Sequence, residues 1–211
     1  MAGAASVLEN DTLISRLDRT LLPLERTLAL VSGLAVFSLM LLAVVSVGGR
    51  QLFDRPLPGY VDWIEQAMPL IAFMGISFVQ REGGHIRMDA VLSRFRGRAL
   101  WAAEFVTVLA MLIIVLALTW GSFAHFERSF DWNAPLWSTD SSFDIYLPLW
   151  PAKLLAPIAF FVLTLRLILQ LVVYGRAFWL DEATPAGAPL IADAATQAAR
   201  EAESVSSAAE N

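Results

Sequence analysis

The apolar stretch 28–47 reads LALVSGLAVFSLMLLAVVSV and contains no charged residue. Its length matches the ~20 residues that an α-helix needs to cross the hydrocarbon core of a bilayer. A helix that is apolar on every side over this length is rarely part of a soluble protein. The stretch therefore predicts a membrane-spanning helix, which we place at about 28–49.

The composition of the whole chain points the same way. Of its 211 residues, 57% are hydrophobic and 17% are charged, and the mean hydropathy is +0.59. Soluble domains are usually about 45–50% apolar and about 25% charged. Cysteine is absent and the formal net charge is −5, so a disulfide-stapled secreted module and a basic nucleic-acid binder are excluded, and no nucleic-acid partner is expected.

Three more apolar stretches predict spans at about 62–80, 102–123 and 146–174, of which the second is the weakest by hydropathy. Tryptophans stand near the predicted span ends, where amphipathic rings suit the headgroup region. The expected fold is an all-α membrane protein with four transmembrane helices. Its expected parts are a partly amphipathic cytoplasmic N-tail (1–23), a membrane domain (24–180) and a flexible C-terminal tail (181–211).

The distribution of basic residues predicts the orientation. With four spans, both tails and the middle loop share one side of the membrane, and nine arginines lie near the membrane there. The opposite side has three arginines, with Lys153 near its edge. Because basic residues are enriched on the cytoplasmic side, we expect both termini in the cytoplasm.

The middle loop predicts a short interfacial helix at about 86–98. Its apolar residues fall on one helical stripe and its arginines on a flank, which is typical of a helix lying in the membrane surface. An ordinary basic loop without a fixed helix is the alternative. The residues expected at this lipid and cytoplasmic interface are Arg81, His85, Arg87, Arg94 and Arg98.

No catalytic constellation is visible, so we expect neither an enzyme nor a bound cofactor. The two histidines, His85 and His125, fall on opposite faces of the predicted membrane domain, which excludes a haem bridge between them. Two charges, Lys153 and Arg166, lie inside the fourth predicted span. We expect them to be interfacial anchors or interhelical pairs, and the long stem of Arg166 could also snorkel to the headgroups. A transport role for such charges is the alternative.

Two motifs carry a resemblance to a known family. Residues 50–58 read RQLFDRPLP, and after an acidic residue and an apolar span, residues 81–89 read REGGHIRMD. Over roughly residues 24–180 the chain resembles the small, four-span membrane subunit of the tripartite ATP-independent periplasmic (TRAP) transporters. Either Asp62 or Glu65 holds the acidic position that this family places after the Pro-x-Pro turn.

The resemblance implies a scaffold subunit in a bacterial inner membrane. It would pack on a large multi-span subunit that carries the sodium and substrate sites, and a periplasmic substrate-binding protein would deliver an organic acid. The docking residues expected on the periplasmic side are Arg50, Arg55, Asp62, Glu65, Glu127, Asp131, Asp140 and Asp144. Two alternatives stay open: an autonomous small oligomeric carrier or channel, and a membrane anchor of an enzyme.

Overall fold

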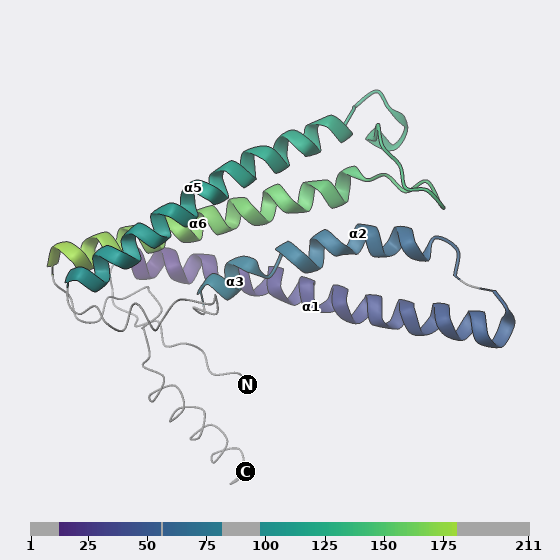
Figure 1. The fold of residues 1–211 in the computed structure, drawn as a ribbon, viewed down its shortest axis with the longest axis horizontal. Helices are drawn as coiled ribbons and strands as arrows, with labels where there is room; N and C mark the ends of the chain where they lie inside the picture. The colour runs from purple at the N-terminus through teal and green to yellow at the C-terminus, as the bar shows by residue number, and fades with distance from the viewer. Residues whose placement is uncertain (1–12, 56, 82–97, 181–211) are drawn as a thin grey trace, which may run out of the picture.

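The computed structural model describes residues 13–55, 57–81 and 98–180, and these residues form helices and two longer connections, the first including 54–55 and 57–59 and the second 130–149 (Figure 1). Two isolated β-bridges occur in the second connection, and the described ranges contain no sheet, so the fold is all-α. The helices are α1 (Leu13–Phe53), α2 (Tyr60–Phe73), α3 (Ile76–Arg81), α5 (Arg98–Ser129) and α6 (Trp150–Leu180), with a short 3-10 helix at Pro135–Trp137.

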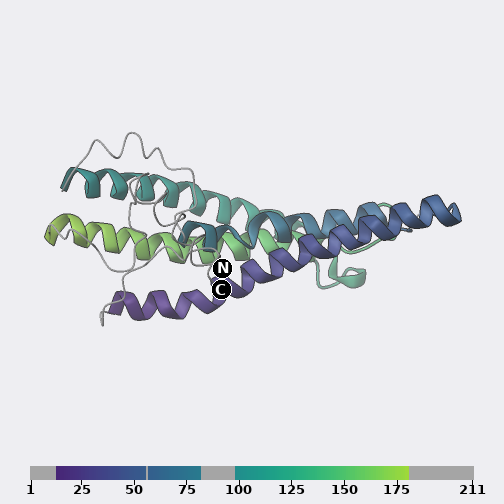
Figure 2. The same cartoon turned by 90° about the horizontal axis from the view of Figure 1, so that it is seen from below.

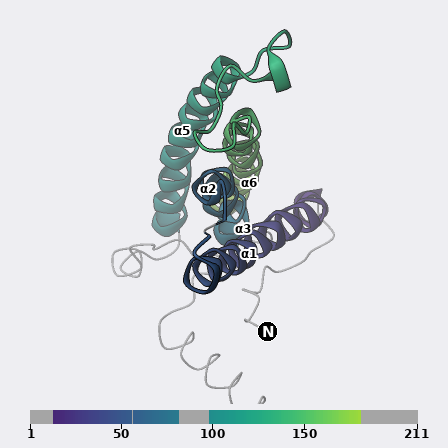
Figure 3. The same cartoon turned by 90° about the vertical axis from the view of Figure 1, so that its right-hand side faces the viewer.

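The helices run along the long axis of the molecule, so the molecule has two ends. We call the end where α1 begins and α6 finishes the terminal end, and the end with the connections 54–59 and 130–149 the loop end. Helix α5 packs mainly on α6, α6 packs on α2 and α3, and α1 packs mainly on α2. Viewed along the helices, this is an open row with α5 at one edge and α1 at the other (Figure 3).

The apolar core lies along the seam between α5 and α6. Val108, Leu112 and Val115 of α5 are buried there against residues such as Leu163 and Leu167 of α6. The opposite edge is different, because none of the residues in the most apolar 18-residue window of α1 is buried. Helix α1 also reaches beyond the loop-end tips of α5 and α6 (Figure 2). A large apolar surface of the chain is therefore left for lipid or for another protein.

Among the described residues, three helices are long and apolar enough to cross a membrane: Arg16–Phe53, Arg98–Ser129 and Trp150–Leu180. They contain the spans predicted at 28–49 and 102–123 and most of the one at 146–174. The last of these starts later than expected, because residues 146–149 are not helical and Tyr146 has a positive φ of 55°.

The second predicted crossing, 62–80, is interrupted. Helix α2 ends at Phe73 and α3 starts at Ile76, so neither piece alone is long enough to span a bilayer. In a continuous helix the carbonyl of Ile71 would accept a bond from the amide of Gly75. Here the hydroxyl of Ser32 on α1 donates to that carbonyl at 3.1 Å. The carbonyl of Ile71 at the break is thus hydrogen-bonded by a neighbouring helix, as is usual where a helix is interrupted in lipid.

The structure describes part of the expected N-tail. Residues 13–23, which were expected to form a tail ending at Pro23, are the first turns of α1. The expected interfacial helix at 86–98 lies outside the described residues except for Arg98, which begins α5 instead of ending that helix. Residues 1–12 and 181–211 also lie outside the described part of the chain.

Candidate functional site

Charged and amide side chains from three helices meet near the terminal end. The charged cluster consists of Asp18 and Glu25 on α1, Arg81 on α3 and Arg166 on α6. Local geometry explains why each helix contributes as it does. Asp18 and Glu25 are seven residues apart, which is two helical turns, so both acids face the same way. On α6, Gln170 follows Arg166 by four residues and extends the polar face by one turn.

Asp18 pairs with both arginines of the charged cluster. Its carboxylate accepts a bond from Arg81 Nη2 at 2.6 Å and another from Arg166 Nη1. Glu25 accepts a bond from the Ser77 hydroxyl at 2.8 Å. Its carboxylate oxygens are 3.7 Å from Arg81 Nη1 and 4.0 Å from Arg166 Nε. Two acids thus face two bases, and their formal charges cancel.

The charged cluster is closed to solvent within this chain. Arg166 and Glu25 are fully buried, and Asp18 and Arg81 are 4% and 7% exposed. Next to it Gln80 donates to Gln170, which is also fully buried, at 2.7 Å. Isolated charges buried in this way would be very costly, so their mutual pairing is what makes the arrangement tenable.

These positions bear directly on the expectations for Arg81 and Arg166. Arg81 was expected at the lipid and cytoplasmic interface, but it turns inward, because Asp18 and Glu25 offer it two carboxylates. Arg166 does not snorkel to the headgroups, because its head is buried against Asp18. Sequence reasoning missed both acids, since it placed Asp18 in a tail. The i, i+7 spacing of Asp18 and Glu25 was a usable signal. His85, Arg87 and Arg94 lie outside the described residues.

A second polar network shapes the connection 130–149 at the loop end. Asp62, in the first turn of α2, accepts bonds from the Ser142 hydroxyl at 2.7 Å and from the backbone amides of Asp144 and Ile145 at 3.0 and 2.8 Å. Gln66, one turn further along α2, donates to the carbonyl of Pro148 at 2.6 Å. Asp62 is buried. Its carboxylate therefore holds the connection against α2 and does not face outward as a docking residue.

Asp140 is also used internally. It pairs with Lys153 at 2.6 Å, and it accepts a bond from the Ser129 hydroxyl at 2.6 Å. These hydrogen bonds, with the positive charge of Lys153, hold the pKa of Asp140 below its ordinary value of 3.8. Lys153 is therefore a loop anchor at the start of α6. Of the other expected docking residues Asp131 is partly buried, and the exposed ones are Arg50, Arg55, Glu65, Glu127 and Asp144.

An aromatic group at the loop end was not predicted as a unit. Phe130 makes edge contacts with Trp132 and Trp150, at centroid distances of 4.8 and 5.4 Å, and Trp137 packs near both tryptophans. The indole of Trp150 also donates to the carbonyl of Leu136 at 3.0 Å. These contacts therefore hold the connection 130–149 in a defined conformation, in which Leu136 and Trp137 have positive φ.

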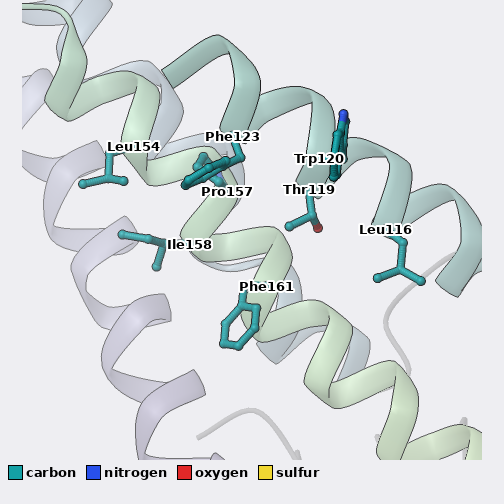
Figure 4. Close-up of a pocket in the computed structure, with 8 residues that line it drawn as sticks. All are labelled: Leu116, Thr119, Trp120, Phe123, Leu154, Pro157, Ile158 and Phe161. Atoms are coloured by element: carbon teal, nitrogen blue, oxygen red, sulfur yellow. The ribbon is translucent and has the colours of Figure 1, made fainter. Parts of the chain in front are cut away.

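A cleft between the loop-end halves of α5 and α6 is a further candidate (Figure 4). It has a volume of about 510 Å³, and its eight lining residues are apolar except Thr119. None of them can titrate, so the cleft offers no acid, base or nucleophile. In the described part of the chain, no group of three or more His, Cys, Asp or Glu residues is placed to hold a metal ion.

Comparison with known proteins identifies one family. The sequence model of the DctQ component of the tripartite ATP-independent periplasmic transporters matches residues 39–174, which is well over half of the chain. The matched range begins within α1 and ends in α6, so it includes Arg81 and Arg166 and leaves out Asp18 and Glu25. The search of curated proteins found no match to the chain.

Proposed function

Because the chain belongs to the DctQ component family of the TRAP transporters, we propose that it is the scaffold subunit of such a transporter. Membership makes it a membrane component of a transport system in the cell membrane, and not an enzyme. It also implies that the chain works together with the other TRAP components. The finer proposal is that it packs on the large transport subunit and helps to dock the periplasmic substrate-binding protein.

The observation that carries this proposal is the open row of helices. A carrier that works alone must enclose a polar path between its helices. Here α5 and α1 are edges, and the window of α1 that could span the membrane has no buried residue. An arrangement of this kind supports a chain completed by a larger partner, and it argues against the autonomous carrier or channel.

The proposed topology follows the charge distribution. Three long helices and the interrupted pair α2 and α3 would make four crossings, with the terminal end in the cytoplasm and the loop end in the periplasm. The docking surface would then lie at the loop end. Its exposed charges include Arg50, Arg55, Glu65 and Glu127, and the aromatic ring of Phe143 in the same connection as Asp144 is also exposed. The substrate class, an organic acid taken up with sodium, comes from the family resemblance alone.

A direct test is co-purification followed by transport assays. We expect a tagged chain, expressed in the cells that it comes from, to retain a large multi-span protein through mild detergent extraction. Liposomes with both membrane subunits and the binding protein should take up an organic acid under a sodium gradient. Sodium-driven uptake by the small subunit alone would contradict the scaffold proposal.

A further inference from the structure

Helix α1 has little apolar packing to keep it in place. The most apolar part of the helix contributes no buried residue. Partly buried apolar residues of α1 also face its neighbours, and polar contacts join them: Ser32 bonds to α2, Ser46 is buried, and Asp18 and Glu25 meet α3 and α6. In lipid, apolar side chains gain little by leaving the acyl chains for one another, so polar contacts and close packing decide how helices associate.

The charged cluster restricts where α1 can lie along its neighbours. A slip of α1 by one turn would move Asp18 by ~5.4 Å along the helix axis. That is more than the reach of the bond of 2.6 Å to Arg81, and it would leave Arg81 and Arg166 buried without their counter-charge. Because an uncompensated buried charge is strongly unfavourable, other positions of α1 are disfavoured.

We propose that Asp18, Glu25, Arg81 and Arg166 form a charge-balanced clasp that positions α1 against α3 and α6. These are positioning residues of the scaffold, and they make residues 13–25 an integral part of the membrane domain. The inference concerns the chain itself. Only its consequence, that the clasp sets where α1 meets the large subunit, rests on the proposed function.

The contacts indicate that charge balance matters more than the shape of each side chain. Glu25 lies 3.7 and 4.0 Å from the two guanidinium groups, beyond ordinary hydrogen-bond length. Among the described residues, its Oε2 atom and the Nε and Nη2 atoms of Arg166 have no hydrogen-bond partner. Glu25 therefore acts on the arginines through its charge. Removing the charges of Glu25 and Arg166 together would leave the short Asp18–Arg81 pair intact and the cluster neutral.

The test uses spin labels in the full chain, reconstituted in lipid nanodiscs. The chain has no cysteine, so the spin labels attach only to the cysteines that are introduced. Thr20→Cys on α1 and Val172→Cys on α6 are both exposed and report how α1 sits on α6. Thr107→Cys with Val172→Cys reports the seam between α5 and α6, which does not involve α1. Pulsed electron resonance gives the distance distribution of each pair.

We expect Glu25→Gln and Arg166→Gln, each alone, to abolish the main Thr20–Val172 distance peak, because each leaves one buried charge in excess. The double variant should restore a narrow peak near the wild-type distance. The Thr107–Val172 peak should stay unchanged throughout. This rescue is the decisive readout, because two substitutions that only damaged packing would not restore the peak.

Two results would overturn the clasp: single variants with the wild-type Thr20–Val172 peak, or a double variant more disordered than either single one. If the single variants do not accumulate in the membrane, the amount of folded double variant replaces the distance readout. A double variant that also fails to accumulate would equally overturn the proposal. Co-purification of the large subunit with the wild-type chain is scored separately, so a failed scaffold role and a failed clasp are distinguishable.

Discussion

The two ends of the molecule use charge in different ways. At the terminal end, four charged groups from three helices are buried together, and Asp18 and Arg166 are 148 residues apart in the chain. At the loop end, Asp140 and Lys153 are 13 residues apart, and the side chain of Asp140 is 46% exposed. Buried pairs are costly to break, whereas exposed pairs contribute little. Charge at the terminal end therefore positions a helix, while the Asp140–Lys153 pair at the loop end only helps to hold a connection in place.

The largest expected effect is at the terminal end. Arg166→Leu leaves Asp18 and Glu25 with Arg81 as their only countercharge in the cluster. We expect a loss of about 3–5 kcal/mol in the stability of the fold, the range for breaking a buried pair on one side. Thermal unfolding of the purified chain in detergent measures it. The matched control is Arg176→Leu, an exposed arginine on the same helix, which should change stability by less than ~0.5 kcal/mol. Equal effects of the two variants would remove the contrast between the ends.

The next effect is at Gly59, where α2 begins at the loop end. Gly59 has φ of 69°, and an added Cβ would lie 2.6 Å from the side chain of Ile145. Gly59→Ala should therefore cost at least about 1–2 kcal/mol from the left-handed backbone alone. Its control is Gly121→Ala, where the added Cβ meets nothing within 4 Å. That change should be neutral or slightly stabilising, because alanine favours a helix by ~1 kcal/mol over glycine. A Gly59→Ala variant as stable as the wild type would contradict this cost of the left-handed backbone at residue 59.

Asp62→Ala tests whether one carboxylate holds the connection 130–149. The substitution removes the acceptor for Ser142, Asp144 and Ile145. We expect the amides of Asp144 and Ile145 to exchange with deuterium roughly tenfold faster, while the rest of the chain keeps its protection. Hydrogen-exchange mass spectrometry reads this out, and Glu65→Ala, an exposed acid on the same helix, is the control. A loss of protection across α5 and α6 would instead make Asp62 a determinant of the whole fold.

The smallest effect is the pH dependence of the Asp140–Lys153 pair. Since the folded pKa of Asp140 is lowered, the pair stabilises the fold fully above the ordinary carboxyl pKa of 3.8. That stabilisation is lost as the pH falls through the lowered value. In Lys153→Met the loss of stability between about pH 5 and pH 2 should be less steep than in the wild type. Unfolding midpoints across this range measure the effect. A steeper loss in the variant would contradict the stabilising role of the Asp140–Lys153 pair.

The sequence predicted the long apolar helices well, because each span is marked by its own residues. The stretch 28–47 lies within α1 and 102–123 within α5, and no distant residue is needed to recognise them. The charged cluster could not be predicted in the same way, since its pairs join residues far apart in the chain. Arg81 was misplaced because it precedes a basic segment, and a local pattern cannot show that Asp18 lies opposite.

The loop end was out of reach for a related reason. Asp62 and Asp140 read as surface acids in a polar connection, and their partners include backbone amides that no sequence pattern marks. The break between α2 and α3 was likewise hidden within an apolar stretch. Pro69 and Gly75 are the residues near it that disfavour a regular helix. The hydroxyl of Ser32, which bonds to the carbonyl of Ile71 at the break, belongs to another helix.

The charged cluster gives α1 a long lever. From Glu25 to Phe53 the helix runs ~42 Å, while α6 runs only ~24 Å from Arg166 to its loop-end start at Trp150. Seen from the cluster, α1 therefore overshoots its neighbour by ~18 Å, in line with its protruding tip in Figure 1. A rotation of about 10° at the cluster would swing Phe53 through ~7 Å, the width of a side chain or more. The position of Phe53 at the loop end thus depends on how rigidly the charged cluster holds α1.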